Sequence, residues 1–483
     1  MRSRWLPGQS RTAAVKYHHY WPIPTRMSLQ PHPMQPDYAP GEQLRLSEVI
    51  GALSYALDLT EGQPAGHCIR CCWIGMHLGR MLGMPQADLL DLYYTLLLKD
   101  AGCSSNAARL YQLYGGDERQ IKNRFKTVDG DHLQEIARFV FENIDGSQGL
   151  VKKMRRFATL VMRGEKYADE LVETRCERGA DIARRLGFNE TIADGIRHLD
   201  EHWNGHGRPY HIKGDQIPIH SRIALLSQVI DVFFQIAGQD AAEEEIHKRR
   251  GSWFDPELVD TFMALRHDRA FWETLVAEDI QFTIQNMAPE SEPALVSDDR
   301  LDDITAAFGM IVDAKSPYTF DHSSRVASYT LAISEELSVD PARRHFLRRG
   351  AFLHDIGKLG VSNDILDKPG KLDDAEWRTV RDHARYTETI LSHLTPFAEL
   401  ARVAGAHHER LDGGGYPYGL TAEEICLETR IITVADIFDA ITAERPYRGP
   451  VPRDKAIEIM RGEVNTAVDE AVLDALVNRL PTL

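Results

Sequence analysis

The chain contains one long segment twice, and this internal repeat constrains its fold more than any single motif. His67 lies 32 residues before Lys99 in "LLLKDAG", and His322 lies 32 residues before His354 in "FLHDIG". Further along, "DEHWNGHGRPYHIKGDQIPIHSRI" (200–223) parallels "HERLDGGGYPYGLTAEEICLETRI" (408–431) over its whole length. Because self-similarity of this kind indicates repeated structural units, we expect two copies of one module.

The copies are expected to cover residues 43–285 and 301–483. Between them, "NMAPESEPALVSDDR" (286–300) is polar, contains proline and lacks periodicity, which is typical of a linker. Residues 1–42 are rich in Pro, Arg, His and aromatic residues without periodicity, so we expect a disordered or loosely packed tail. The tail lacks the apolar segment of an ordinary secretory signal.

Each copy is predicted to be helical. Segments such as "DHSSRVASYTLAISEELSV" carry apolar residues three and four positions apart, and the second copy shows no sustained alternation of the kind that predicts strands. Asp340 and Pro341 mark a helix start, and Gly357 stands where that helix is expected to stop. The expected fold class is all-α, with two tandem helical bundles.

Composition excludes several classes of partner. The chain has 72 acidic and 56 basic residues and a formal net charge of −16, which argues against general binding to nucleic acid polymers or anionic membranes. No uninterrupted apolar stretch approaches the roughly 20 residues of a membrane-spanning helix, so no transmembrane span is expected. The six cysteines form no regular framework, so reduced thiols in a cytoplasmic protein are expected.

The second copy carries a set of side chains suited to divalent metals. It comprises five histidines and two aspartates: His322, His354, Asp355, His383, His407, His408 and Asp436. Imidazole and carboxylate without thiolate favour a borderline ion such as Fe, Mn or Zn. Seven ligands exceed one tetrahedral site and are typical of two metals with a shared carboxylate. Asp355 is the expected bridge, because it is the carboxylate at the centre of the histidine-rich set, and a water between the two cations would be the nucleophile.

The first copy has lost most of this set. The matching positions hold Lys99 for His354, Leu199 and Asp200 for His407 and His408, Gln228 for Asp436, and Arg175 for His383. A histidine that only fills a core has no reason to disappear as part of a group. The loss therefore favours a common role as ligands in the second copy and a degenerate first copy.

The motifs His354-Asp355 in "HDIGK" and "HHERLDGGGYP" (407–417) resemble those of the HD-GYP family, a branch of the HD-domain metal phosphohydrolases. The resemblance covers nearly all of 301–460. It implies a helical fold and a metal centre, most often iron or manganese with zinc, nickel or cobalt as alternatives, that hydrolyses cyclic di-GMP to pGpG. Carried over by position, the seven residues above are the metal ligands, and Asp355 and Lys358 belong to the catalytic site. The resemblance further places Lys358, Tyr416, Arg445 and Arg448 beside the substrate.

One position departs from the family pattern. Members with a third metal carry Glu four residues before the first histidine, where this chain has Tyr318. A phenol is a poor substitute for that carboxylate, so we expect a two-metal centre that releases pGpG.

Two alternatives stay open at this stage. In the first, the substrate is another cyclic dinucleotide, such as cyclic GMP-AMP, since the sequence does not determine which base is recognised. Alternatively, the chain is a signalling scaffold that binds without turnover, although the complete ligand set weighs against this. The first copy, with a charged insertion at about 104–170, is expected to serve packing, homodimerisation, control of the second copy or binding of a signalling partner.

Overall fold

The computed structural model describes residues 44–128, 133–146, 149–289, 295–444 and 449–483. The expected tail falls outside these ranges. Every regular element within them is a helix, and no β-strand occurs there. The all-α fold class is therefore confirmed.

The first part of the chain contains thirteen α-helices among its described residues. They are α1 (Leu46–Thr60), α2 (His67–Met81), α3 (Gln86–Leu98), α4 (Ala107–Tyr114), α5 (Glu118–Phe125), α6 (Leu133–Asn143), α7 (Leu150–Arg185), α8 (Glu190–Arg197), α9 (Ile219–Ala237), α10 (Gln239–Lys248), α11 (Pro256–Ala264), α12 (Arg269–Thr274) and α13 (Ile280–Met287). Short 3-10 helices are η1 (Cys103–Asn106), η2 (Gly214–Gln216) and η3 (Leu265–His267).

The second part contains nine α-helices among its described residues. They are α14 (Asp298–Asp313), α15 (His322–Glu336), α16 (Pro341–Leu353), α17 (Asn363–Leu366), α18 (Asp374–Ser392), α19 (Ala398–Gly405), α20 (Leu427–Thr442), α21 (Arg453–Arg461) and α22 (Glu470–Arg479). The 3-10 helices are η4 (Pro317–Thr319), η5 (Ile356–Gly360), η6 (Thr395–Phe397) and η7 (Leu480–Thr482).

Helix α16 begins as its sequence predicts. The Asp340 carboxylate accepts a hydrogen bond from the backbone N–H of Ala342 (2.8 Å), and Pro341 occupies the first turn. The helix ends at Leu353, earlier than the expected stop at Gly357, because the chain tightens into η5 and packs against α18. This tightening places residues 354–358 at the junction of several helices.

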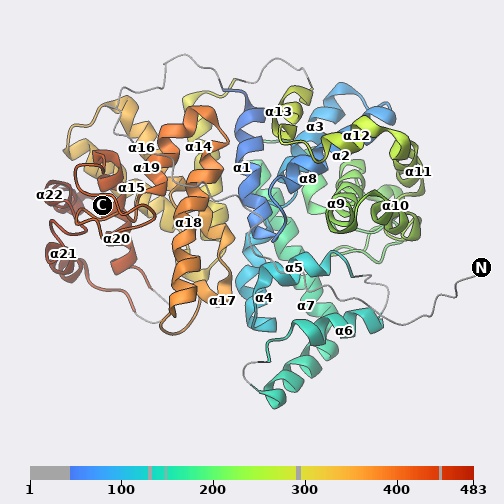
Figure 1. Ribbon diagram of the computed structural model, residues 1–483, viewed down its shortest axis with the longest axis horizontal. Helices are drawn as coiled ribbons and strands as arrows, with labels where there is room; N and C mark the ends of the chain where they lie inside the picture. Colours follow the sequence, from blue (N-terminus) through green and yellow to red (C-terminus); the bar gives the residue numbers. More distant parts are fainter. Residues whose placement is uncertain (1–43, 129–132, 147–148, 290–294, 445–448) are drawn as a thin grey trace, which may run out of the picture.

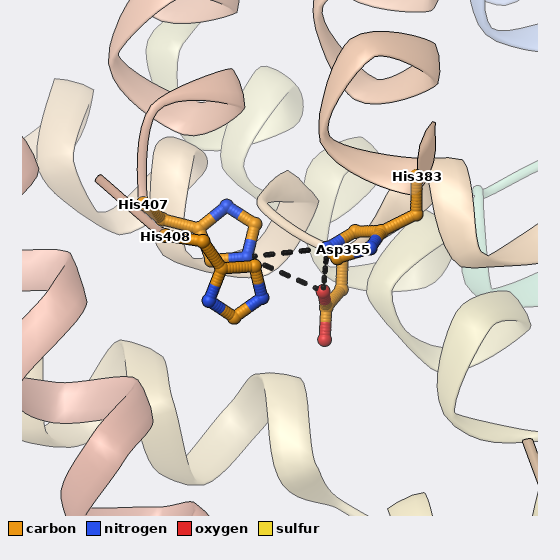
Figure 2. Close-up of side chains that lie close together, drawn as sticks. All are labelled: Asp355, His383, His407 and His408. Atoms are coloured by element: carbon orange, nitrogen blue, oxygen red, sulfur yellow. Dashed lines mark hydrogen bonds and ion pairs between the residues drawn. The ribbon is translucent and has the colours of Figure 1, made fainter. Parts of the chain in front are cut away.

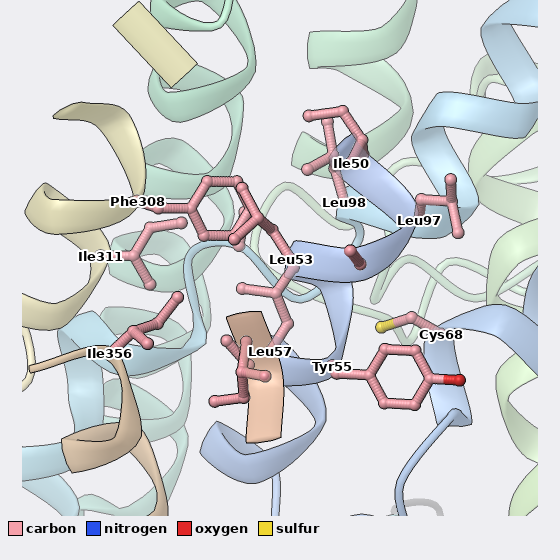
Figure 3. Close-up of a cluster of buried hydrophobic side chains, with 14 of the residues drawn as sticks. Ile50, Leu53, Tyr55, Leu57, Cys68, Leu97, Leu98, Phe308, Ile311 and Ile356 are labelled. Carbon is pink, nitrogen blue, oxygen red and sulfur yellow. The ribbon is translucent and has the colours of Figure 1, made fainter. Parts of the chain in front are cut away.

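Helix α1 lies between the two groups of helices (Figure 1). Nearly all of its residues are buried, because helices of both copies pack around it. Leu53 and Leu57 face Phe308 and Ile311 of α14 and Ile356 of η5 (Figure 3). One continuous apolar cluster therefore joins the first copy to the second.

The insertion at about 104–170 forms a separate part of the fold. It comprises α4, α5, α6 and the first half of α7, and α6 and the start of α7 project at the lower edge of Figure 1. A second, smaller apolar cluster stabilises it, formed by Leu110, Ile121, Phe139, Val140, Ile144 and Leu160. The insertion thus has its own small core.

Helix α9 is long and apolar enough to cross a membrane, with a mean hydropathy of 1.2. Within the fold, 67% of that window is buried against other helices. Its length and composition are therefore also those of a core helix, which is the position it occupies here.

Candidate metal centre

The seven predicted ligands come from five segments of the second copy and converge on one buried point. His322 is the first residue of α15, His354 and Asp355 follow α16, and His383 lies within α18. The remaining three, His407, His408 and Asp436, follow α19 or lie within α20. All but His408 are buried.

The carboxylate of Asp355 lies at the centre and divides the histidines into two sets. Its Oδ2 is 3.4 Å from Nε2 of His322 and 3.3 Å from Nε2 of His354. Its Oδ1 is 3.4 Å from Nε2 of His383 and 3.5 Å from Nε2 of His407 (Figure 2). Each oxygen of one carboxylate thus faces its own pair of imidazoles.

Asp436 and His408 complete the two sets. Oδ1 of Asp436 lies 3.4 Å from Nε2 of His322 and 3.9 Å from Nε2 of His354, on the Oδ2 side of Asp355. The ring of His408 lies 4.0 Å from that of His407, centroid to centroid, on the Oδ1 side. The ligand atoms of His322, His354 and Asp355 lie close enough together to surround one cation, as do those of Asp355, His383, His407 and His408. Asp436 groups with His354 and His407.

The outer nitrogens of the histidines are held by hydrogen bonds that orient the rings. Nδ1 of His354 is 2.7 Å from the carbonyl oxygen of Ala351, and Nδ1 of His407 is 2.6 Å from that of Ala404. Because a carbonyl only accepts, Nδ1 carries the proton and Nε2 presents its lone pair to the centre. This is the tautomer that a metal-binding imidazole requires.

The pKa values differ sharply across the centre. Burial lowers the pKa of His383 to about 3, so this imidazole is neutral at ordinary pH. Burial also lowers the pKa of His322, but the nearby Asp355 carboxylate and the hydrogen bond to Asp439 outweigh it and raise that pKa to about 9. For Asp355, burial is outweighed by the Lys358 ammonium and by His354, which hold its pKa well below the usual value. The central carboxyl is therefore ionised.

Gly357 brings η5 close to α18. A Cβ at this position would lie 2.0 Å from the carbonyl oxygen of His383. Gly102 of the first copy has the same relation to the carbonyl oxygen of Arg175, at 1.9 Å. Only glycine permits these approaches, and the match places Arg175 at the position that corresponds to His383.

The residues expected beside the substrate are placed in part. The Lys358 ammonium contacts the Asp355 carboxylate and remains partly exposed. The ring of Tyr416 lies 4.8 Å from that of His408, and a cis peptide bond joins Tyr416 to Pro417, as one joins Arg208 to Pro209 in the first copy. Arg445 and Arg448 lie outside the described residues.

The matching position in the first copy contains an ammonium group. Nζ of Lys99 is 3.1 Å from Nε2 of His67 and 3.1 Å from Oε1 of Gln228, and it also contacts the Asp100 carboxylate. All four side chains are buried. The Lys99 ammonium thus contacts the retained His67 and Asp100 and the amide of Gln228.

Two functional carboxylates were missed by the sequence reasoning. Asp439 accepts a hydrogen bond from Nδ1 of His322 (2.7 Å), as Asp231 does from His67 (2.6 Å). Glu409 accepts from the backbone N–H of Tyr418 (2.6 Å) and so orders the loop after His408. The first copy has the same residue at each position: Asp231 matches Asp439, and Glu201 matches Glu409. A comparison of the two repeats would therefore have identified both carboxylates.

A family model described as HD domain matches residues 155–258 and 307–472. The chain is 54% identical over 439 residues to the "3'3'-cGAMP-specific phosphodiesterase 3" of Vibrio cholerae, covering 90% of this chain and 95% of that protein. A "Cyclic di-GMP phosphodiesterase" of Thermotoga maritima is 36% identical over 172 residues, which cover 35% of this chain and 47% of that protein.

The crystal structure of a cyclic GMP-AMP-specific phosphodiesterase of V. cholerae superposes with a TM-score of 0.64 at 49% sequence identity. The match covers 91% of this chain and 99% of that chain. Together with the motifs around His354 and Tyr416, these similarities confirm the resemblance seen in the sequence. The chain belongs to the HD domain family, in its HD-GYP branch.

Proposed function

We propose that the second copy is a metal-dependent phosphodiesterase that hydrolyses 3′3′-cyclic GMP-AMP to a linear dinucleotide. The observation that carries the proposal is the position of Asp355, whose two oxygens face two separate sets of histidines. Such an arrangement fits two cations that share one carboxylate. The catalytic assignment of Asp355 and Lys358 and the seven-residue ligand set are part of this proposal.

The residues present fit divalent metals. Nε2 of His322, Nε2 of His354 and Oδ1 of Asp355 are buried and have no hydrogen-bond partner among the described residues. Buried polar atoms are costly unless something satisfies them. Iron or manganese suits the mixture of imidazole and carboxylate, with zinc, nickel or cobalt as alternatives.

Bound divalent ions would supply Lewis-acid stabilisation of the phosphoryl oxygens and lower the pKa of water at the site. The protein's own groups orient the ligands and bind the phosphate. The backbone carbonyls behind His354 and His407 hold the imidazoles in one tautomer. Lys358, which is partly exposed, presents an ammonium to an anionic phosphate at the edge of the centre.

A surface cavity of about 680 Å³ is lined by residues that precede and follow His322 in the chain, although by none of the seven proposed ligands. Its lining includes Tyr318, Phe320, Arg325 and Tyr329. Nε of Arg325 donates to Asp439 (2.6 Å), the carboxylate that also holds His322. Aromatic rings and a cation in a space of this size suit a nucleobase with its phosphate.

The choice of cyclic GMP-AMP rests on the comparisons. The relative that matches over nearly the whole chain is named for that dinucleotide, whereas the cyclic di-GMP phosphodiesterase of T. maritima matches about a third of the chain. The comparisons therefore favour the alternative from the sequence analysis over cyclic di-GMP, its first expectation.

The expected product is the linear dinucleotide. Tyr318 lies in η4, where a carboxylate for a third metal would be needed. The proposal therefore keeps two metals and a single cleavage. Within it, residues 301–483 are the catalytic unit, 43–285 are the degenerate unit and 286–300 connect them.

The direct test loads the purified protein anaerobically with Fe(II) or Mn(II) and follows cyclic GMP-AMP, cyclic di-GMP and cyclic di-AMP by product chromatography. The highest kcat/KM is expected for cyclic GMP-AMP, with the linear dinucleotide accumulating. Asp355→Ala is expected to abolish turnover while the circular dichroism spectrum stays unchanged. Faster cleavage of cyclic di-GMP would reverse the substrate assignment, and no turnover with any metal would favour the scaffold alternative.

A further inference from the structure

A fully buried carboxylate of the first copy makes its polar contacts with the second. Glu118 is the first residue of α5, within the insertion, and its side chain is 0% exposed. Its Oε1 accepts a hydrogen bond from Nζ of Lys315 (2.9 Å), and its Oε2 accepts from the backbone N–H of Asn363 (2.8 Å). Lys315 is buried as well. One side chain thus ties together two segments that are separated in the second copy.

These two segments carry parts of the proposed metal centre. Lys315 follows α14 and precedes η4 and His322, whereas Asn363 begins α17 just after η5, which contains Lys358. Nδ2 of Asn363 also donates to the carbonyl oxygen of Lys315 (2.8 Å). Glu118 therefore joins the chain before the first histidine to the chain after the lysine.

The neighbouring residue contacts η5 itself. The Arg119 guanidinium donates to the carbonyl oxygen of Gly360, the last residue of η5, and pairs with Asp117 (2.9 Å) in its own copy. In Figure 1, α4 lies beside α17. The start of α5 thus meets η5 and α17 through adjacent side chains.

A buried ion pair fixes the relative positions of its two partners more than it adds to the free energy of unfolding. Desolvation of both charges offsets most of their attraction, whereas loss of one partner leaves a buried charge uncompensated. The pair therefore fixes one arrangement of the two segments and penalises others. The carboxylate is supplied by the insertion, which the second copy lacks.

We propose that Glu118 is a positioning residue for the active site of the second copy, acting through Lys315 and Asn363. This inference rests on the proposed function of that site. It gives the degenerate copy a specific role, because α5 of that copy holds the segments that carry His322 and Lys358 at their working separation. A displacement of about 1 Å in such groups is enough to cost roughly 100-fold in rate.

Two variants of the full chain test the inference directly. Glu118→Gln keeps the shape and one oxygen but removes the charge that pairs with Lys315, and kcat for cyclic GMP-AMP is expected to fall about 10- to 100-fold with a smaller change in KM. Glu118→Gln with Lys315→Met removes both charges, and kcat is expected to recover to within about threefold of the parent.

Asp255→Asn is the matched control. Asp255 is a buried carboxylate of the first copy that pairs with Arg222 (2.7 Å) and caps α11, so both of these contacts lie within its own copy. The kcat of the Asp255→Asn variant is expected to equal that of the parent protein at temperatures where both are folded. Hydrogen–deuterium exchange over residues 354–366 is expected to accelerate in Glu118→Gln and to stay unchanged in Asp255→Asn.

Parent-like kcat and exchange in Glu118→Gln would overturn the inference, as would an equal loss of kcat in Asp255→Asn. Failure of the double variant to regain activity would do the same. If the parent protein cleaves no cyclic dinucleotide, the proposed function fails, and the exchange measurement still decides whether Glu118 positions the two segments.

Discussion

The ammonium nitrogen of Lys99 lies 3.1 Å from Nε2 of His67, at the position where the second copy has His354 near His322. In the second copy, Nε2 of both histidines has no hydrogen-bond partner among the described residues. In the first copy, the ammonium group of Lys99 contacts the imidazole of His67, the carboxylate of Asp100 and the side-chain amide of Gln228. The two copies therefore stabilise a similar polar pocket by different means.

Replacement of Lys99 with Met is expected to destabilise the protein by about 3–5 kcal/mol, because it leaves the buried Asp100 carboxylate without its closest cation. Urea unfolding followed by circular dichroism measures the loss. Lys455→Met is the control, since Lys455 pairs with Glu458 (2.7 Å) and both side chains are exposed. Equal stability losses in the two variants would contradict this view of Lys99.

The contribution of His67 to the stability of the protein is expected to fall as the pH drops below 6.5. Burial and the nearby Lys99 ammonium lower its pKa to about 4, and its nitrogens face Asp231 and Lys99. The unfolded chain therefore binds more protons between about pH 4 and 6.5, and the folded state loses up to about 3 kcal/mol across that window.

Urea unfolding at several pH values measures this slope. In His67→Asn the group no longer titrates, so the dependence over that window is expected to become shallower. A slope identical to that of the parent would assign the acid sensitivity to other groups.

Metal binding is expected to depend on the second copy alone. After loading with Mn(II) and dialysis, the parent chain should retain two ions, measured by elemental analysis. His322→Asn should lower that number, because its Nε2 faces both Asp355 and Asp436. His67→Asn, at the corresponding position of the first copy, should leave it unchanged. A loss of metal in both variants would show that the first copy also binds ions.

Lys358→Met is expected to lower kcat/KM for cyclic GMP-AMP by roughly 100-fold, the scale for removing one preorganised donor to developing charge. Lys358→Arg keeps the charge and is expected to recover part of the loss. Steady-state kinetics with the metal content held equal measures both. Parent-like activity in Lys358→Met would remove this residue from the site.

The sequence by itself determined the helical class, the duplication and the set of side chains to examine. Apolar spacing and helix capping act over a few residues, and the loss of ligands such as His354 to Lys99 is visible by aligning the chain with itself. The same comparison would have pointed to Asp439, whose counterpart Asp231 is retained.

Only the tertiary structure decided how these residues meet. That the two oxygens of Asp355 face different histidines depends on the packing of α15, α18 and the end of α19 around η5. The contact of Glu118 with Asn363 joins positions 245 residues apart, and no local pattern encodes it. Such contacts arise where packed helices bring distant segments together, so their geometry follows from the fold as a whole.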